Sequence, residues 1–162
     1  MKVRILVLVL IFTVFDCSME RPTIFSENAL NDELLTVDDR TIRLAEVLNE
    51  NKGKVIFLDI WATWCRDCMV GFPEIRALQK EFPAVDFIFL SVDKNPAAWR
   101  KGVQKYNMQG QHYFIKSGWD GPIGEFVRLN WIPRYMIIDE QGLIKLFKAT
   151  KAGDKKIKAA LL

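Results

Sequence analysis

Histidine and cysteine are scarce in this chain: its 162 residues include one histidine, His112, and three cysteines. This scarcity argues against a metal centre, because a structural zinc site takes four ligands that are mostly of these two types. It also argues against a cysteine–histidine hydrolase, since no third group is evident that would orient the histidine. We therefore expect no metal site, and we expect His112 to lie at the surface or at a strand end.

An excess of one charge sign is lacking as well. The chain has 23 basic and 20 acidic side chains, interspersed, and a formal net charge of +3. Without a basic stripe, nucleic acid is not an expected partner. Repeats and low-complexity segments are also absent, and with 50% hydrophobic residues the chain can bury the core of one domain.

No apolar run is long enough to cross a membrane comfortably as a helix. The main candidate, Ile5 to Phe15, is well short of the roughly 20 residues that a transmembrane helix needs. Two basic residues, Lys2 and Arg4, precede it, and this order is typical of a secretory signal peptide. Residues 1–16 are therefore predicted to be a signal peptide.

A cysteine stands where the signal peptide would end. No small-residue cleavage site follows the apolar run; Asp16 and Cys17 follow it instead. Cys17 resembles the lipidated first residue of a mature bacterial lipoprotein. We expect an exported protein on the periplasmic side, with residues 17–33 as a polar tether to the membrane. The anchor is then a lipid on Cys17 or, alternatively, an uncleaved N-terminal segment.

Residues 34–162 have the mixed strand and helix patterns of an α/β domain. Two apolar patches between Leu34 and Leu44 predict a hairpin around a polar turn. The continuous apolar run Val55–Trp61 is typical of a strand buried on both faces, and apolar residues from Met69 to Phe82 at spacings of three or four predict a helix. Further patterns predict a strand at 85–92, a helix from residue 96, an extended segment at 112–115, a short helix at 123–129, a hairpin of 135–138 with 143–147, and a helix at 152–162.

The most informative feature is Trp64-Cys65-Arg66-Asp67-Cys68, which lies at the junction of the buried strand and the following helix. A thiol at a helix N-terminus faces unpaired backbone N–H groups and the positive end of the helix dipole, and both favour the thiolate. Arg66 adds to this effect and Asp67 opposes it, so we expect these two residues to tune the redox pair. A second sulfur one turn away can form, break and exchange a disulfide.

With its flanking residues, this motif resembles the active-site segment of the thioredoxin superfamily, and most closely the exported, membrane-tethered TlpA/ResA-like branch. The resemblance extends from Leu34 to Leu162. It implies a thioredoxin fold, with a mixed central sheet flanked by helices and an N-terminal β-hairpin extension. Three features carry it: the segment Phe57–Cys68 followed by Pro73, the later Ile132-Pro133 before a strand, and the terminal hairpin with Asp139 and Gly142.

The resemblance also implies the roles of three residues. Cys65 corresponds to the attacking thiol and Cys68 to the resolving thiol. Asp59, inside the apolar strand, matches the buried acid of the superfamily, which takes a proton from the resolving cysteine. Burial should raise the pKa of this carboxyl group. The alternative is a strand-end carboxylate that faces solvent.

A substrate-binding surface is implied around the later proline. Ile132-Pro133 matches the cis-proline loop, which faces the disulfide and offers backbone groups to an extended substrate. We expect Trp64, Trp131 and Ile132 to form an apolar rim around the sulfur atoms, whereas the sequence leaves Trp119 unassigned. Arg134 departs from the small hydroxyl residues that are common at this position, which bears on substrate preference.

The expected function is thiol–disulfide exchange with protein substrates outside the cytosol, as a reductase. The redox-active Cys65–Cys68 disulfide makes a dissociable cofactor unnecessary, and a membrane electron donor or acceptor is a further expected partner. A copper-handling module on the same fold is one alternative, although such relatives have one more residue between the cysteines. A thioredoxin-like peroxidase and a docking domain with vestigial cysteines are the others.

Overall fold

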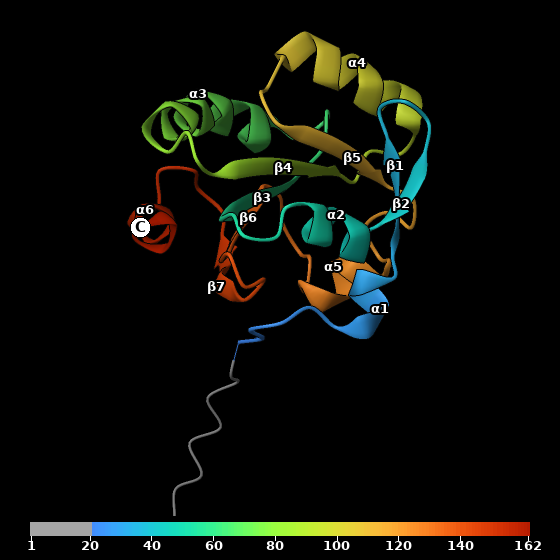
Figure 1. Ribbon diagram of the computed structural model, residues 1–162. Helices are drawn as coiled ribbons and strands as arrows, with labels where there is room; N and C mark the ends of the chain where they lie inside the picture. The colour runs from blue at the N-terminus through green and yellow to red at the C-terminus, as the bar shows by residue number, and fades with distance from the viewer. Residues whose placement is uncertain (1–20) are drawn as a thin grey trace, which may run out of the picture.

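A seven-stranded mixed sheet forms the centre of the molecule (Figure 1). The computed structural model describes residues 21–162, so the predicted signal peptide and Cys17 lie outside the described residues. The arrangement confirms the predicted α/β thioredoxin fold. In spatial order the strands are β2 (Thr41–Arg43), β1 (Glu33–Thr36), β5 (Gln111–Ile115), β4 (Asp86–Ser91), β3 (Ile56–Trp61), β6 (Arg134–Ile138) and β7 (Ile144–Ala149).

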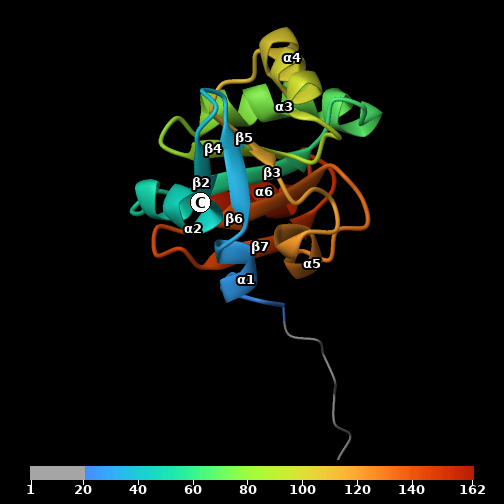
Figure 2. The ribbon, with the colours of Figure 1, turned by 90° about the vertical axis from the view of Figure 1, so that its right-hand side faces the viewer.

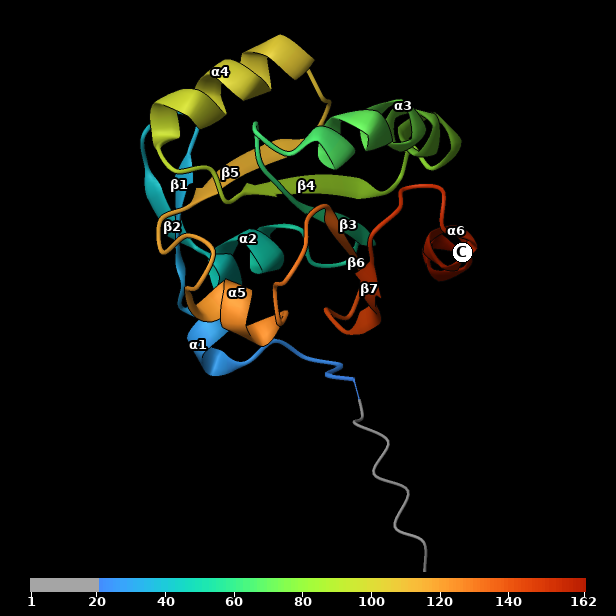
Figure 3. The ribbon, with the colours of Figure 1, turned by 180° about the vertical axis from the view of Figure 1, so that it is seen from behind.

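The central strand β3 carries the chain toward the two cysteines. It pairs in parallel with β4 and antiparallel with β6, and all of its residues are buried. Helices cover both faces of the sheet: α3 (Arg66–Glu81) and α4 (Pro96–Tyr106) lie on one, α2 (Leu44–Glu50) and α5 (Pro122–Phe126) on the other (Figure 1, Figure 3). This double coverage explains why the strand is apolar without alternation.

The N-terminal hairpin predicted between Leu34 and Leu44 is present. Strands β1 and β2 pair antiparallel, and β1 also pairs antiparallel with β5, so the hairpin widens the sheet beyond β5 (Figure 2). Thr36 closes the turn, since its N–H donates to the carbonyl of Arg40 at 2.8 Å and its hydroxyl accepts the N–H of Arg40 at 2.9 Å. The hairpin is thus a continuous part of the sheet.

Part of the predicted tether, residues 17–33, is folded against the domain. There the chain forms α1 (Glu27–Leu30), and Phe25 and Ala29 are buried. The ring of Phe25 lies 5.0 Å from the ring of Phe126 in α5. These apolar contacts hold the segment against the domain.

The longest described helix, α3, continues through Pro73. Its apolar face buries Phe72, Ile75 and Leu78 against the sheet, as the spacing of three and four predicts. Within residues 21–162, none of the helices combines the length and hydrophobicity that crossing a bilayer would take.

The C-terminal elements follow the prediction with one difference. Strands β6 and β7 form the expected hairpin, whose turn contains Gly142 at a φ of +88°, a conformation that glycine adopts at low cost. Helix α6 (Lys155–Leu161) packs beside β7. It begins later than predicted, because residues 151–153 form a turn and the carboxylate of Asp154 caps the helix by accepting the N–H of Lys156 at 2.9 Å.

Candidate active site

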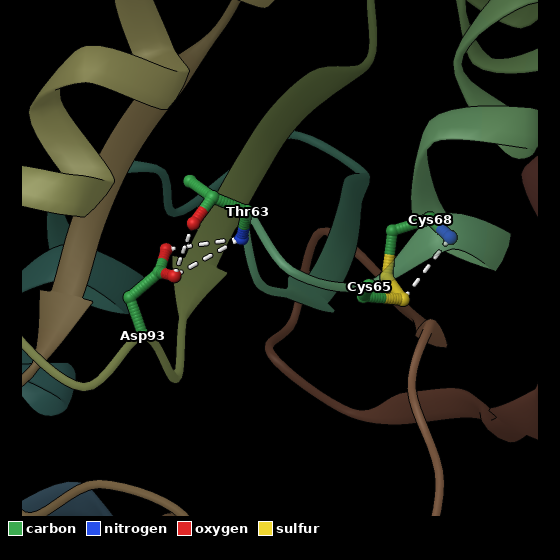
Figure 4. The surroundings of a disulfide bond; sticks show 4 residues. All are labelled: Thr63, Cys65, Cys68 and Asp93. Atoms are coloured by element: carbon green, nitrogen blue, oxygen red, sulfur yellow. Dashed lines mark hydrogen bonds between the residues drawn. A yellow bond between two sulfur atoms is a disulfide. The ribbon is translucent and has the colours of Figure 1, made fainter.

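Cys65 and Cys68 are joined by a disulfide bond at the beginning of α3, with Cα atoms 5.4 Å apart (Figure 4). Cys65 is the N-cap residue of this helix, and its Sγ accepts the N–H of Cys68 at 3.1 Å. Cys65 is 6% exposed, whereas Cys68 is fully buried. A large partner can therefore reach only the first sulfur, where the free N–H groups of the helix end favour a thiolate.

The loop between β3 and Cys65 is held by Asp93, a residue that the sequence did not single out. Its carboxylate accepts the N–H of Thr63 at 3.1 Å and the hydroxyl of Thr63 at 2.6 Å (Figure 4). The same carboxylate accepts the hydroxyl of Ser91 at 2.8 Å, and Asp93 is 4% exposed. This buried network fixes the residues immediately before the redox pair.

Asp59 lies in the interior of β3 and is completely buried. Its strand neighbours are Phe89 on β4 and Tyr135 on β6. Neither carboxyl oxygen has a hydrogen-bond partner among residues 21–162. Because no group compensates for the lost hydration, burial raises the pKa of Asp59 well above its usual value. The alternative of a solvent-facing carboxylate is therefore wrong.

A groove of about 390 Å³ opens beside Cys65. Trp64 and Trp131 lie on it and are each more than half exposed, and Ile132 lies on it although it is nearly buried. The apolar rim that the sequence predicted is therefore present. Trp119, which the sequence left unassigned, lies on the same groove, with its ring 6.3 Å from that of Trp64.

The peptide bond between Ile132 and Pro133 is cis, as expected. Next to it, Arg134 is fully buried and forms no ion pair with any described residue. Its guanidinium donates to the carbonyl of Val127, to the carbonyl of Arg128 at 3.4 Å and to Oδ1 of Asn130 at 3.3 Å. Burial lowers the pKa of Arg134. The arginine thus positions residues 127–130, at the entrance to the cis-proline loop.

His112 lies away from this groove, in β5. Its ring stacks on Phe89 at 4.8 Å, and its Nε2 is 2.8 Å from the carbonyl oxygen of Met108. Burial lowers the pKa of His112. Within residues 21–162, no three histidine, cysteine or acidic side chains gather in an arrangement that could hold a metal ion.

The fold and the Cys-x-x-Cys pair together define a thioredoxin-type protein with a disulfide at the start of the helix that follows the central strand. Residues 53–144 match the family model described as thioredoxin-like. This match covers more than half of the chain, and the chain therefore belongs to the thioredoxin-like family.

Relatives with curated names agree with this assignment. The chain is 30% identical over 126 residues to the thiol:disulfide interchange protein DsbE of Pseudomonas aeruginosa, covering 77% of this chain and 66% of that protein. It is 30% identical over 102 residues to the thioredoxin-like protein YneN of Bacillus subtilis, covering 60% of this chain and 58% of that protein. The chain thus spans about 60% of the length of these two relatives.

A solved structure also agrees with the assignment to the thioredoxin-like family. A solution structure from Bacteroides vulgatus, described as a candidate thiol-disulfide oxidoreductase, superimposes with a TM-score of 0.67 at 29% sequence identity. The superposition covers 82% of this chain and 85% of that one.

Proposed function

We propose that this protein is a thiol–disulfide oxidoreductase that exchanges disulfides with polypeptide substrates through Cys65 and Cys68. One observation carries the proposal: a disulfide at the N-terminus of a helix, with its first cysteine opening onto an apolar groove next to a cis-proline loop. The names of the relatives support the same chemistry.

In the reducing direction the reaction has two exchange steps. The Cys65 thiolate attacks one sulfur of a substrate disulfide, forms a mixed disulfide, and releases the other substrate sulfur as a thiolate that takes up a proton. Cys68 then loses its proton and attacks Sγ of Cys65. The Cys65–Cys68 disulfide forms, and the second substrate thiol leaves with a proton. The substrate gains two electrons, which the cysteine pair supplies, and two protons, one from the Cys68 thiol and one from the solvent, because Cys65 reacts as the thiolate.

Asp59 is the base that we assign to the second step. Among residues 21–162, it is the one buried carboxyl group on a strand whose oxygens have no hydrogen-bond partner, and its strand leads into the active-site loop. Burial raises the pKa of Asp59, so its ionised carboxylate is a stronger base than an ordinary aspartate and is suited to accept the proton of the Cys68 thiol.

The substrate is a polypeptide that lies in extended form along Ile132 and Pro133. A chain in this position can pair with backbone groups of the loop, as an added strand pairs with a sheet edge. The exposed rings of Trp64 and Trp131 would contact the side chains beside the substrate cysteine. Arg66 and Asp67, with opposite charges next to the sulfur atoms, tune the reduction potential.

We place the protein outside the cytosol, on the periplasmic side and tethered to the membrane, as the basic and apolar N-terminal residues and Cys17 indicate. Disulfides persist there. The cysteine pair is the redox centre and needs no dissociable cofactor. A membrane electron donor would keep it reduced and would make the protein a reductase.

A redox titration tests the proposed function. The pair is equilibrated in glutathione or dithiothreitol buffers, and its state is read from tryptophan fluorescence, because Trp64 lies next to the sulfur atoms. We expect a two-electron transition with a potential closer to the about −270 mV of thioredoxin than to the about −120 mV of DsbA. A potential near the second value would make the protein an oxidant, and a pair that does not titrate would contradict the proposed function.

A further inference from the structure

A second groove lies next to the one that contains Cys65. It has a volume of about 760 Å³ and is formed by the first turns of α3, the start of β6 and residues 150–154. Asp67 and Trp131 lie on both grooves, and Pro133 lies on the second. A polypeptide that passes Pro133 in extended form would therefore contact both. We call the second one the acidic groove, after its residues Asp67, Glu74 and Asp154.

Tyr135 gives the acidic groove a buried polar group without a partner. The residue lies on the groove and is fully buried, and its hydroxyl has no hydrogen-bond partner among residues 21–162. A Cβ added to Gly71 would lie 2.6 Å from that hydroxyl, so the oxygen rests against the backbone of α3. Because an unpaired buried hydroxyl costs free energy, this position favours a ligand that can hydrogen-bond to it.

Negative charge predominates around this hydroxyl. Three carboxylates, of Asp67, Glu74 and Asp154, lie on the groove against one ammonium group, that of Lys151. Neither Asp67 nor Glu74 forms an ion pair with any described residue. Oε1 of Glu74 would be 3.4 Å from a Cβ added to Gly153, so this carboxylate reaches across the groove from α3 toward the opposite loop.

The carboxylate of Glu74 also lies within electrostatic reach of the phenol. Burial raises the pKa of Tyr135, and the negative charges of Asp59 and Glu74 raise it further. A neutral hydroxyl with a carboxylate nearby is a combination that suits a cationic hydrogen-bond donor, because the hydroxyl accepts a hydrogen bond and the carboxylate supplies the countercharge.

We propose that the acidic groove binds the side chain of a lysine or arginine that lies close to the reactive cysteine of the substrate polypeptide. The inference rests on the proposed function and defines its substrate class: polypeptides in which a basic residue flanks the disulfide. Glu74 pairs with the cation, and Tyr135 accepts one of its hydrogen bonds. Lys151 weakens the attraction without reversing it, and an acidic residue at the same substrate position is repelled.

The test uses the reduced protein with Cys17→Ser, so that only the redox pair supplies thiols. The substrates are peptides whose single cysteine is disulfide-bonded to 5-thio-2-nitrobenzoate. The peptides differ only at the residue immediately before or immediately after the cysteine, which is arginine, glutamine or glutamate. Release of the coloured thiolate gives the second-order rate constant. The variants are Glu74→Gln and Tyr135→Phe, and the control is Glu50→Gln, which makes the same charge change on α2.

At one or more positions we expect the arginine peptide to react about five-fold faster than the glutamate peptide at low salt, with glutamine between them. Glu74→Gln should reduce the ratio of the arginine rate to the glutamate rate to about two or less. Tyr135→Phe should lower this ratio partly, and Glu50→Gln should leave it unchanged. Salt at 0.5 M should also lower it.

An arginine-to-glutamate rate ratio near one at every position would overturn the acidic groove as a binding site. So would a ratio in Glu74→Gln that equals the ratio of the unsubstituted protein. The proposed function would survive that result if the glutamine peptide still reacts. Reaction with none of the peptides would overturn both, so the two failures are distinguishable.

Discussion

Thr63 donates two hydrogen bonds to one carboxylate, that of Asp93: its N–H at 3.1 Å and its hydroxyl at 2.6 Å. The two residues come from the ends of the neighbouring strands β3 and β4, so the contact ties the loop before Cys65 to the sheet. Because Asp93 is nearly buried, the hydrogen bonds are shielded from water. The position of the redox pair therefore depends on a residue far from it in sequence.

Asp93→Ala should destabilise the protein by about 1–3 kcal/mol, because it leaves the N–H and hydroxyl of Thr63 without an acceptor. It should also slow exchange, since the loop before Cys65 loses its support. Urea unfolding measures the first effect and peptide-disulfide reduction the second. Asp86→Ala is the control: its exposed ion pair with Lys54 is worth about 0–1 kcal/mol. Equal losses in the two variants would contradict the positioning role.

Asp59 makes stability depend on pH, with a defined sign. The folded protein keeps the Asp59 proton to a higher pH than the unfolded chain, whose aspartate pKa is about 3.8. Unfolding therefore releases this proton as the pH rises above 3.8, and the free energy of unfolding falls until the folded pKa is passed. Below the unfolded pKa both states are protonated, and this loss vanishes.

Asp59→Asn cannot ionise and should remove that loss. We expect it to match the unsubstituted protein near pH 4 and to be more stable by about 1–3 kcal/mol at pH 8, as measured by urea unfolding of the oxidised proteins. Asp120→Asn, at an exposed position, should change little at either pH. If Asp59→Asn is no more stable than the unsubstituted protein at pH 8, the ionised carboxylate of Asp59 does not destabilise the fold, contrary to what its burial indicates.

The same substitution should slow the second exchange step selectively. In Asp59→Asn, attack by Cys65 should proceed at nearly the normal rate, while the mixed disulfide should persist about 10–100-fold longer at pH 7. At higher pH the difference should shrink, because hydroxide can deprotonate Cys68. Acid quenching of a single turnover, followed by mass spectrometry, measures both steps. A slower first step with a normal second step would contradict the assignment of Asp59 as the base.

Arg134→Met tests whether the buried arginine positions the substrate loop. The change removes the donors to residues 127–130, but it also removes an unpaired buried charge, so stability should change by less than about 1 kcal/mol. Substrate binding should weaken, with KM rising about 3–10-fold and kcat nearly constant. Steady-state reduction of a peptide disulfide measures both constants, and an unchanged KM would show that the loop does not need the arginine.

The sequence alone was sufficient to predict the fold and the residues at its centre. The apolar run of β3, which only Asp59 interrupts, predicts a buried strand directly, whereas the tryptophan before Cys65 and the isoleucine–proline pair before β6 indicate the fold through their resemblance to the thioredoxin superfamily. Asp59 could be predicted as buried for the same reason, since a single carboxyl group stands inside an apolar strand.

The contacts that the sequence did not reveal join residues far apart in the chain. Thr63 and Asp93 are 30 residues apart, and nothing near either one indicates the pairing. The buried guanidinium of Arg134 is held by the carbonyl groups of Val127 and Arg128, in the loop before β6. The space for the Tyr135 hydroxyl depends on the absence of a side chain at Gly71. The burial of Phe25 was missed because its partner Phe126 lies about a hundred residues further along the chain, so the sequence around Phe25 does not reveal the contact.

The most direct test of the central claim is to trap the mixed disulfide. The reduced Cys68→Ala variant, with Cys17→Ser, is mixed with a peptide disulfide and analysed by mass spectrometry. We expect the peptide to be attached to Cys65 and to stay there, and we expect Cys65→Ala to capture much less, because Cys68 is buried. Equal capture by the two variants, or none by Cys68→Ala, would contradict the account in which Cys65 attacks and Cys68 resolves.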